Sequence, residues 1–166
     1  MIEVRDVNSQ DQLFLTKTLL FGDVEIGVNN IIKFGYGIPG FESLTKFVIL
    51  DLKDYYPFRI LQSIEESDIA ILILNVRALR VCNRIEIPYR NIEKIKAKSV
   101  NQIDIYVILK TDTKSKQLLA NLRAPLLVNT GEKIGEQVIL DNDSLEVEYA
   151  LGKELVDLNS FSGSNT

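Results

Sequence analysis

The chain has 166 residues, an apolar fraction of 46% and a formal net charge of −4 at pH 7. This length fits one domain, and the apolar fraction is typical of a globular core, which argues against a disordered protein. The negative charge opposes direct nucleic-acid binding, because such binding needs a basic face. The sequence also lacks an apolar run of the roughly 20 residues that cross a bilayer, so we expect no membrane segment.

The sequence contains no histidine and a single cysteine, Cys82. Without histidine, the usual general base, the Ser-His-Asp triad and the common zinc ligand are missing. Cys82 has arginines on both sides, but we predict a small apolar filler or an inert surface thiol. We therefore predict no enzyme activity, no catalytic residue, no metal site and no cofactor. The lone cysteine and a start that lacks a secretory signal pattern predict a cytoplasmic protein.

Short runs rich in Ile, Val, Phe and Tyr, bounded by Gly, Asn, Asp and Pro, follow one another along most of the chain. Many short strands with few helices predict an all-β, mostly antiparallel fold, either a small β-barrel or a sandwich, with one or two short helices. The expected strands are residues 13–21, 23–26, 31–34, 47–52, 58–64, 69–76, 84–87, 104–110, 117–122, 124–128, 136–140 and 145–149.

The apolar pattern within these runs predicts how each strand is buried. Residues 69–74 are apolar on both faces, which predicts a central strand. Residues 85–87 alternate between apolar and charged, which predicts a strand with one wet face. Two helices are expected, one turn at residues 41–47 with Ser43 as its cap and a longer helix at residues 88–97 that starts at Pro88.

The two ends of the chain differ from its middle. Residues 1–15 are polar and irregular at first, and we interpret them as an N-terminal extension with room for one added strand. Residues 16–156 form the predicted domain. Residues 157–166 are rich in Ser, Asn and Gly and predict a disordered C-terminal tail.

The stretch Gly37-Ile38-Pro39-Gly40-Phe41-Glu42 is the most informative part of the sequence. Its glycines give the backbone access to positive φ, and Pro39 fixes its own φ. Two large apolar side chains, Ile38 and Phe41, are therefore held on a constrained turn. Such a turn either fills a core or presents an apolar anchor to a partner helix, and both alternatives remain open.

Further segments follow this loop in a fixed order. Residues 61–63 read Leu-Gln-Ser before an acidic turn, residues 121–125 read Asn-Leu-Arg-Ala-Pro, and residues 137–140 read Gln-Val-Ile-Leu. Together with the loop, they resemble the flagellar assembly factor family FliW over roughly residues 18–155. The resemblance implies a FliW-like β-barrel domain.

The resemblance also implies a function as a partner-switching regulator. FliW-like proteins bind the translational repressor CsrA allosterically, which relieves repression of flagellin mRNA. They also bind flagellin, which couples the flagellin level to its own translation. The implied partners are thus CsrA and flagellin, with the chain a monomer or a weak homo-oligomer. A small-ligand-binding β-barrel, another non-catalytic interaction module, and an enzyme that uses Cys82 or paired carboxylates are the alternatives.

The motif residues and one acidic segment are the candidate partner-binding residues. Arg123 either pairs internally with Glu42 or holds a partner carboxylate, and Asn121 is typical of a turn that satisfies backbone amides. The acidic segment, residues 141–148, is a solvated turn and strand or a surface that steers a basic partner. The full set of candidates is Ile38, Pro39, Phe41, Glu42, Gln62, Asn121, Arg123, Asp143 and Glu146.

Overall fold

The computed structural model describes residues 2–3 and 12–152. Most of the N-terminal extension and the tail predicted at residues 157–166 lie outside the described residues. Residues 2 and 3 form β1 (Ile2–Glu3), which pairs with Leu52 and Asp51 of a barrel strand.

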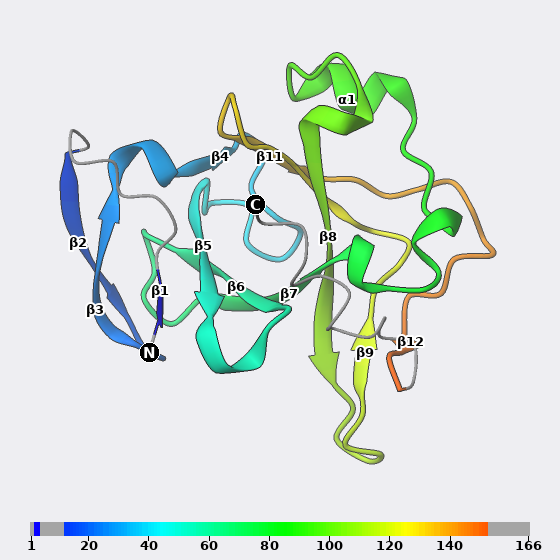
Figure 1. Ribbon diagram of the computed structural model, residues 1–166, viewed down its shortest axis with the longest axis horizontal. Coiled ribbons are helices and arrows are strands. Elements are labelled where there is room, and N and C mark those ends of the chain that lie inside the picture. The colour runs from blue at the N-terminus through cyan, green and yellow to red at the C-terminus, as the bar shows by residue number, and fades with distance from the viewer. Residues whose placement is uncertain (1, 4–11, 153–166) are drawn as a thin grey trace, which may run out of the picture.

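Seven strands close into a barrel, shown in Figure 1. They are β4 (Ile32–Phe34), β5 (Lys46–Leu52), β6 (Phe58–Ser63), β7 (Ala70–Asn75), β8 (Ile103–Thr111), β10 (Leu126–Asn129) and β11 (Ile134–Gln137). Their order around the barrel is β10–β11–β4–β5–β6–β7–β8, and pairing of β8 with β10 closes it. All these pairs are antiparallel except β4 with β11, which is parallel. The predicted all-β, mostly antiparallel class is confirmed, in its barrel form.

The barrel interior is filled with large apolar side chains. Phe34, Phe47, Leu61 and Ile73 are each 0% exposed and belong to one cluster. The rings of Phe34 and Phe47 meet edge to face with centroids 5.4 Å apart. A Cβ at Gly135 would lie 2.4 Å from the Phe34 ring, so β11 carries glycine where the core leaves no room.

A hairpin of β2 (Leu13–Thr18) and β3 (Gly22–Gly27) covers one outer side of the barrel. Figure 1 shows it in blue beside β5, and Ile26 packs with Val48, Leu50 and Ile60 from β5 and β6. The strand predicted at residues 13–21 ends at Thr18, because a turn begins there. This hairpin explains why β5 is apolar on both faces, since one face lines the barrel and the other is covered.

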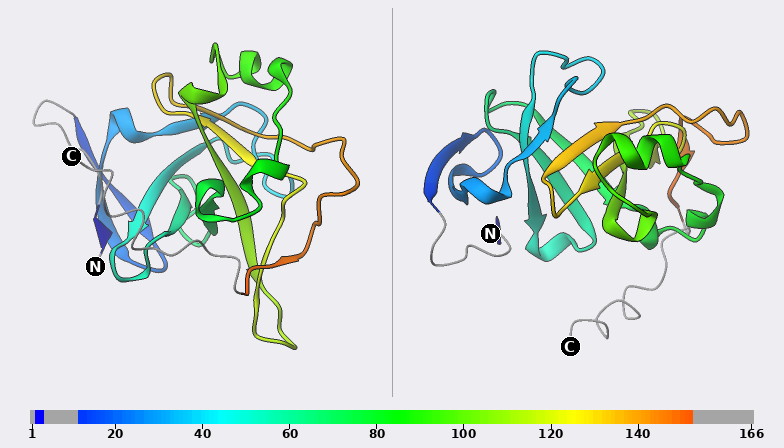
Figure 2. Two further views of the ribbon diagram at one scale, coloured as in Figure 1. Left: turned by 45° about the vertical axis from the view of Figure 1, so that its right-hand side comes forward. Right: turned by 90° about the horizontal axis from the view of Figure 1, so that it is seen from above.

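Strand β8 pairs with β10 and β9 in addition to β7. Its first half pairs with β10, while residues 109–111 pair with β9 (Leu118–Ala120), which pairs with β12 (Tyr149–Ala150). The β8–β9 hairpin therefore projects from the barrel, as Figure 2 shows. A second apolar cluster forms where this hairpin, the loops and α1 (Tyr89–Lys94) meet.

The helix predicted at residues 88–97 is present but shorter. Pro88 stands at the N-cap of α1, and Ile92 and Ile95 are buried. Asn129 ties the helix to the barrel, because its Nδ2 donates to the Ile95 carbonyl at 2.9 Å. Among residues 2–3 and 12–152, no helix is both long and apolar enough to span a membrane.

The other short elements are 3₁₀ turns, and the helical turn predicted at residues 41–47 is wrong. Phe41 forms a β-bridge with Ile38, residues 42–43 form a turn and β5 begins at Lys46, so Ser43 does not cap a helix. The 3₁₀ turns are η1 (Val28–Asn30), η2 (Lys53–Tyr55), η3 (Val76–Ala78), η4 (Cys82–Arg84) and η5 (Val100–Gln102).

Three predicted strands are wrong or much shorter. Residues 85–87 follow η4 as a loop, residues 138–140 lie beyond the end of β11, and residues 145–148 precede β12. Some of their apolar side chains are still buried in the second cluster, namely Ile85, Val138, Leu140 and Leu145, whereas Ile139 and Val147 are exposed. The burial here comes from loops that lie on the core rather than from strands of a sheet.

Candidate protein-interaction site

The loop between β4 and β5 is folded into successive tight turns. The Phe41 amide donates to the Ile38 carbonyl at 2.6 Å, and the Leu44 amide donates to the Phe41 carbonyl at 3.0 Å. Gly37 has a φ of 67°, and a Cβ there would lie 2.6 Å from the Glu42 backbone. Glycine is therefore needed at this position for both backbone conformation and space.

The apolar side chains of this loop lie in different environments. Ile38 is 1% exposed and packs in the barrel core with Phe34 and Phe47. Phe41 is 36% exposed, and Pro39 is exposed as well. The two alternatives from the sequence thus apply to different residues, with Ile38 filling the core and Phe41 and Pro39 presented at the surface.

Glu42 stabilises the loop from its outer side. Its Oε1 accepts a hydrogen bond from the Gly40 amide at 2.9 Å. This bond, followed by one from its own backbone amide, lowers the pKa of Glu42 below the usual value, so the carboxylate is ionised at neutral pH. The pairing with Arg123 that the sequence suggested is not formed, because Arg123 pairs with Asp143.

Gln62 lies inside the molecule and holds a neighbouring turn. Its side chain is 0% exposed, and Nε2 donates to three backbone carbonyls of residues 63–69 at 2.9, 3.3 and 3.2 Å. Glu65 in this turn accepts from the amides of Thr45 and Lys46 at 2.8 and 3.1 Å. These contacts give Gln62 a folding role, since its side chain has no exposed surface.

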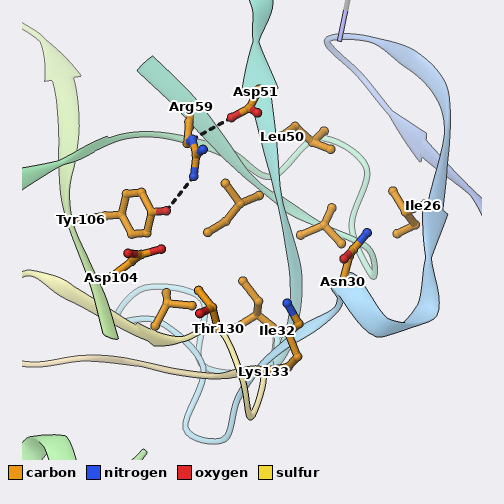
Figure 3. Close-up of a pocket in the computed structure, with 13 residues that line it drawn as sticks. Ile26, Asn30, Ile32, Leu50, Asp51, Arg59, Asp104, Tyr106, Thr130 and Lys133 are labelled. Carbon is orange, nitrogen blue, oxygen red and sulfur yellow. Dashed lines mark hydrogen bonds and ion pairs between the residues drawn. The ribbon is translucent and has the colours of Figure 1, made fainter. Parts of the chain in front are cut away.

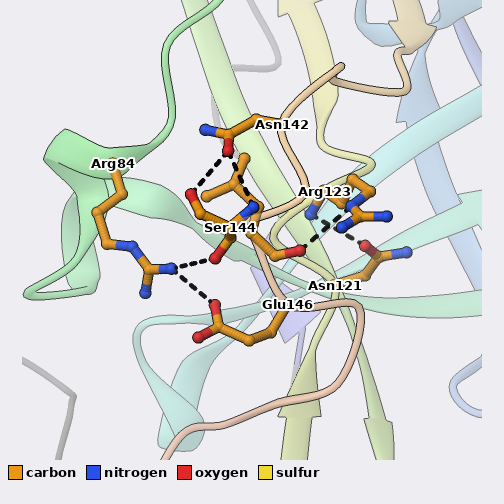
Figure 4. Close-up of polar contacts among 7 residues, drawn as sticks. Arg84, Asn121, Arg123, Asn142, Ser144 and Glu146 are labelled. Carbon is orange, nitrogen blue, oxygen red and sulfur yellow. Dashed lines mark hydrogen bonds and ion pairs between the residues drawn. The ribbon is translucent and has the colours of Figure 1, made fainter.

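The Asn-Leu-Arg-Ala-Pro segment anchors the acidic segment. Asn121 Oδ1 accepts from the amides of Arg123 and Ala124, each at 3.1 Å, which is the predicted turn role. Arg123 Nε donates to the Leu145 carbonyl at 3.2 Å (Figure 4). Its Nη2 lies 3.4 Å from Asp143 Oδ1. Arg123 is therefore engaged internally, while Asp143 is fully exposed.

A second arginine holds the acidic segment from the other side, as Figure 4 shows. Arg84 Nη2 donates to the Ser144 carbonyl at 2.6 Å and to Glu146 Oε2 at 2.9 Å. The Glu146 backbone amide and Arg84 together lower the pKa of Glu146. Lys110 pairs with Glu148. Three of the segment's four carboxylates thus face a cation, which reduces its negative potential.

A small polar pocket opens beside β5, shown in Figure 3. Arg59 links Asp51 Oδ1 at 2.7 Å to the Tyr106 hydroxyl at 2.8 Å. Burial raises the pKa of Tyr106 despite the nearby guanidinium. The pKa of Arg59 is also raised, because Tyr106 and Asp51 outweigh the burial that would lower it. The volume of about 220 Å³ is below the usual range of ligand pockets, which counts against this pocket as a small-ligand site.

Cys82, the residue of the enzyme alternative, lies beside apolar side chains. Its thiol is partly buried and packs against the second apolar cluster. Within the described ranges, residues 2–3 and 12–152, no group of His, Cys, Asp and Glu side chains is placed to hold a metal ion.

A groove of about 510 Å³ runs between the 35–42 loop, the end of α1 and β11. Tyr36 stands beside it with 87% of its surface exposed. Lys94 from α1 and Glu136 from β11 face each other across it, with Nζ and Oε1 3.8 Å apart. Sequence reasoning missed these three residues. Of the three, only Tyr36 stands out in the sequence, because it is an aromatic residue between two glycines.

The comparisons with known proteins agree on one family. The family model described as FliW protein matches residues 15–151 of the chain. The flagellar assembly factor FliW of Thermoanaerobacter pseudethanolicus is 35% identical over 136 residues, which cover 81% of this chain and 91% of that protein. This chain belongs to the FliW family.

Two more FliW proteins support the assignment. That of Caldicellulosiruptor bescii is 34% identical over 144 residues, covering 87% of this chain and 94% of that protein. A crystal structure of a flagellar assembly factor FliW superimposes with a TM-score of 0.74 at 30% identity, covering 83% of this chain and 96% of that one. The FliW fold therefore extends over most of the chain.

Proposed function

We propose that this chain is a cytoplasmic, non-catalytic regulator of flagellar assembly that binds the translational repressor CsrA and also binds flagellin. Binding to the repressor relieves repression of flagellin mRNA, and flagellin that accumulates before export competes for the chain. Mutual exclusion of the two partners is sufficient for such a switch. Membership of the FliW family makes a protein-partner role in flagellar assembly the starting point.

The main observation behind the proposal is that apolar side chains of the loop between β4 and β5 lie in two different environments. Ile38 fixes the loop in the barrel core, while Phe41 and Pro39 are presented outside it. A partly exposed aromatic on a backbone held by hydrogen bonds loses little conformational freedom on binding, which favours it as an anchor. The acidic character of the whole chain also suits a basic, RNA-binding partner.

The direct test is a competition experiment with purified proteins. Adding the chain to a complex of CsrA and labelled flagellin mRNA leader should release the RNA, and adding flagellin should restore the complex. If the chain releases the RNA but added flagellin does not restore the complex, then flagellin does not compete with CsrA for the chain. No release at any concentration of a folded chain would overturn repressor antagonism itself.

Phe41→Ala tests the anchor within the same assay. We expect it to weaken binding of at least one partner by roughly tenfold, the effect of losing an interface aromatic worth more than about 1.4 kcal/mol. Ile139→Ala is the matched control, because Ile139 is an exposed apolar residue outside the loop, at 77% exposure. Equal binding by both variants and by the unmodified chain would show that the loop does not contact either partner.

Salt and charge changes test the acidic segment. We expect CsrA binding to weaken as salt rises, and flagellin binding through apolar contacts to depend on salt less. The double variant Asp143→Asn with Glu146→Gln should slow association with CsrA more than it speeds dissociation. Because Arg123 and Arg84 already face these carboxylates, we expect a change of only a small factor. Stopped-flow kinetics at low and high salt measure it, and an unchanged association rate would place the docking site elsewhere.

A further inference from the structure

The groove between the 35–42 loop, α1 and β11 contains a carboxylate that the protein itself satisfies poorly. Glu136 has a side chain that is 20% exposed, and its Oε2 is buried without a hydrogen-bond donor among the described residues. Among the described residues, its Oε1 faces Lys94 at 3.8 Å, which is a loose ion pair beyond hydrogen-bond distance. Burying a carboxylate oxygen without a donor costs free energy, and a donor bound in the groove would recover it once the Glu136 carboxylate turns Oε2 toward the groove.

The surroundings of Glu136 suit a cation that is flat and rich in donors. Glu42 lines the same groove and is ionised, so the groove has one more carboxylate than cations. Tyr36 also lines it and offers a ring that is 87% exposed. A guanidinium group has five donors in one plane and stacks on aromatic faces, whereas an ammonium group is a compact point charge.

Lys94 is the only cation lining the groove within the described chain, and it is held weakly. Its side chain is 62% exposed, so it is free to turn toward solvent when another cation arrives. The groove volume of about 510 Å³ leaves room for a long side chain to enter. Lys94 therefore competes with an incoming cation for the Glu136 carboxylate, and a cation that fits the groove better displaces it.

We infer that this groove receives an arginine side chain of a basic protein partner, with its guanidinium between the Glu136 and Glu42 carboxylates and against the Tyr36 ring. The inference rests on the proposed function in taking the RNA-binding repressor as that partner. Flagellin, the second partner, is not required to use the groove. Specificity for arginine over lysine follows from the two carboxylates and the ring acting together.

Isothermal titration of the full chain with the repressor tests the inference through variants with opposite effects. Glu136→Gln should weaken binding roughly tenfold or more, because it removes a charged acceptor. Lys94→Met should tighten binding roughly two- to fivefold, because it removes the competing cation. Matched controls with the same charge changes are Glu132→Gln and Lys98→Met, both at exposed positions outside the groove. Neither control should change the affinity beyond a small factor.

Tyr36→Ala is a further variant that leaves folding unaffected, because Tyr36 is exposed, and it should weaken binding about fivefold. Thermal melts of each variant confirm that it is folded. If the unmodified chain binds the repressor but Glu136→Gln, Lys94→Met and Tyr36→Ala bind as tightly as their controls, the inference is overturned while the proposed function stands.

A probe without the repressor separates the inference from the proposed function. N-acetyl-arginine amide should shift the amide resonances of Gly35, Gly37 and Glu136 in the full chain, and N-acetyl-lysine amide should shift them less. Both responses should disappear in Glu136→Gln. Shifts that are equal for the two probes, or absent at the highest soluble concentration, would overturn arginine recognition even if the repressor binds.

Discussion

The Ile38→Asp protein should fail to fold at 25 °C. Ile38 is 1% exposed within a cluster of aromatic and aliphatic side chains, so aspartate there would be an unpaired buried charge. The effective penalty for burying an unpaired ion is several kcal/mol, which is comparable to the roughly 5–15 kcal/mol of stability of an ordinary domain. Far-UV circular dichroism and thermal melting measure the outcome.

Two companion variants make this result specific. Ile38→Val should cost only about 0.5–1.5 kcal/mol, since it shortens the side chain without adding a charge. Phe41→Ala should cost less than the roughly 3–5 kcal/mol of a fully buried phenylalanine, because Phe41 is 36% exposed. A cooperative melt of Ile38→Asp close to that of the unmodified chain would show that Ile38 is not part of the core.

Gly37→Ala should be the second most damaging change in the loop, and Gly40→Ala is its matched control. Both glycines have positive φ, 67° and 90°, so alanine is strained at either position. At Gly37 the added Cβ would also lie 2.6 Å from the Glu42 backbone, whereas at Gly40 nothing lies within 4 Å. Strain alone costs about 1–3 kcal/mol, and the clash adds to it only at Gly37.

Chemical denaturation of the two alanine variants separates the clash from the strain. We expect Gly37→Ala to unfold at the lower denaturant concentration, and the difference in unfolding free energy measures the clash. The Gly37→Ala loop should also bind partners more weakly, because relief of the clash moves Glu42. Equal stabilities for the two variants would mean that the loop backbone adjusts at no cost.

The barrel strands β5 to β8 could be predicted from the sequence, because their residue types are typical of strands. Each is a run of β-branched and aromatic residues with turn residues at its ends. Residues 85–87 alternate between apolar and charged and residues 138–140 are all apolar, both patterns typical of strands, yet the two segments are loops. The local pattern of apolar residues does not show whether a neighbouring strand is placed to pair with the segment.

The parts of the candidate site that one segment forms could be predicted from the sequence. The contacts between segments that lie far apart in the chain could not. The loop at residues 37–42 was found from its glycines and proline, and Asn121 was correctly interpreted as a turn residue. The partner of Arg123 was not found, because Asp143 reaches it only through the path of the acidic segment. Glu136 and Lys94 look like ordinary surface charges in the sequence, since α1 and β11 meet only in the folded barrel.

The parallel pair of β4 and β11 has a consequence for the order in which the protein is made. Strands β5 to β8 pair with their neighbours in chain order, but Lys33 of β4 pairs with Ile134 of β11. A ribosome releases β4 and the following loop long before it releases β11, so the barrel cannot close during most of translation. The 35–42 loop and β11, which line the groove on two sides, therefore come together only after the chain has been synthesised past β11. A truncated or nascent chain would carry the loop motif without the surface that it helps to build.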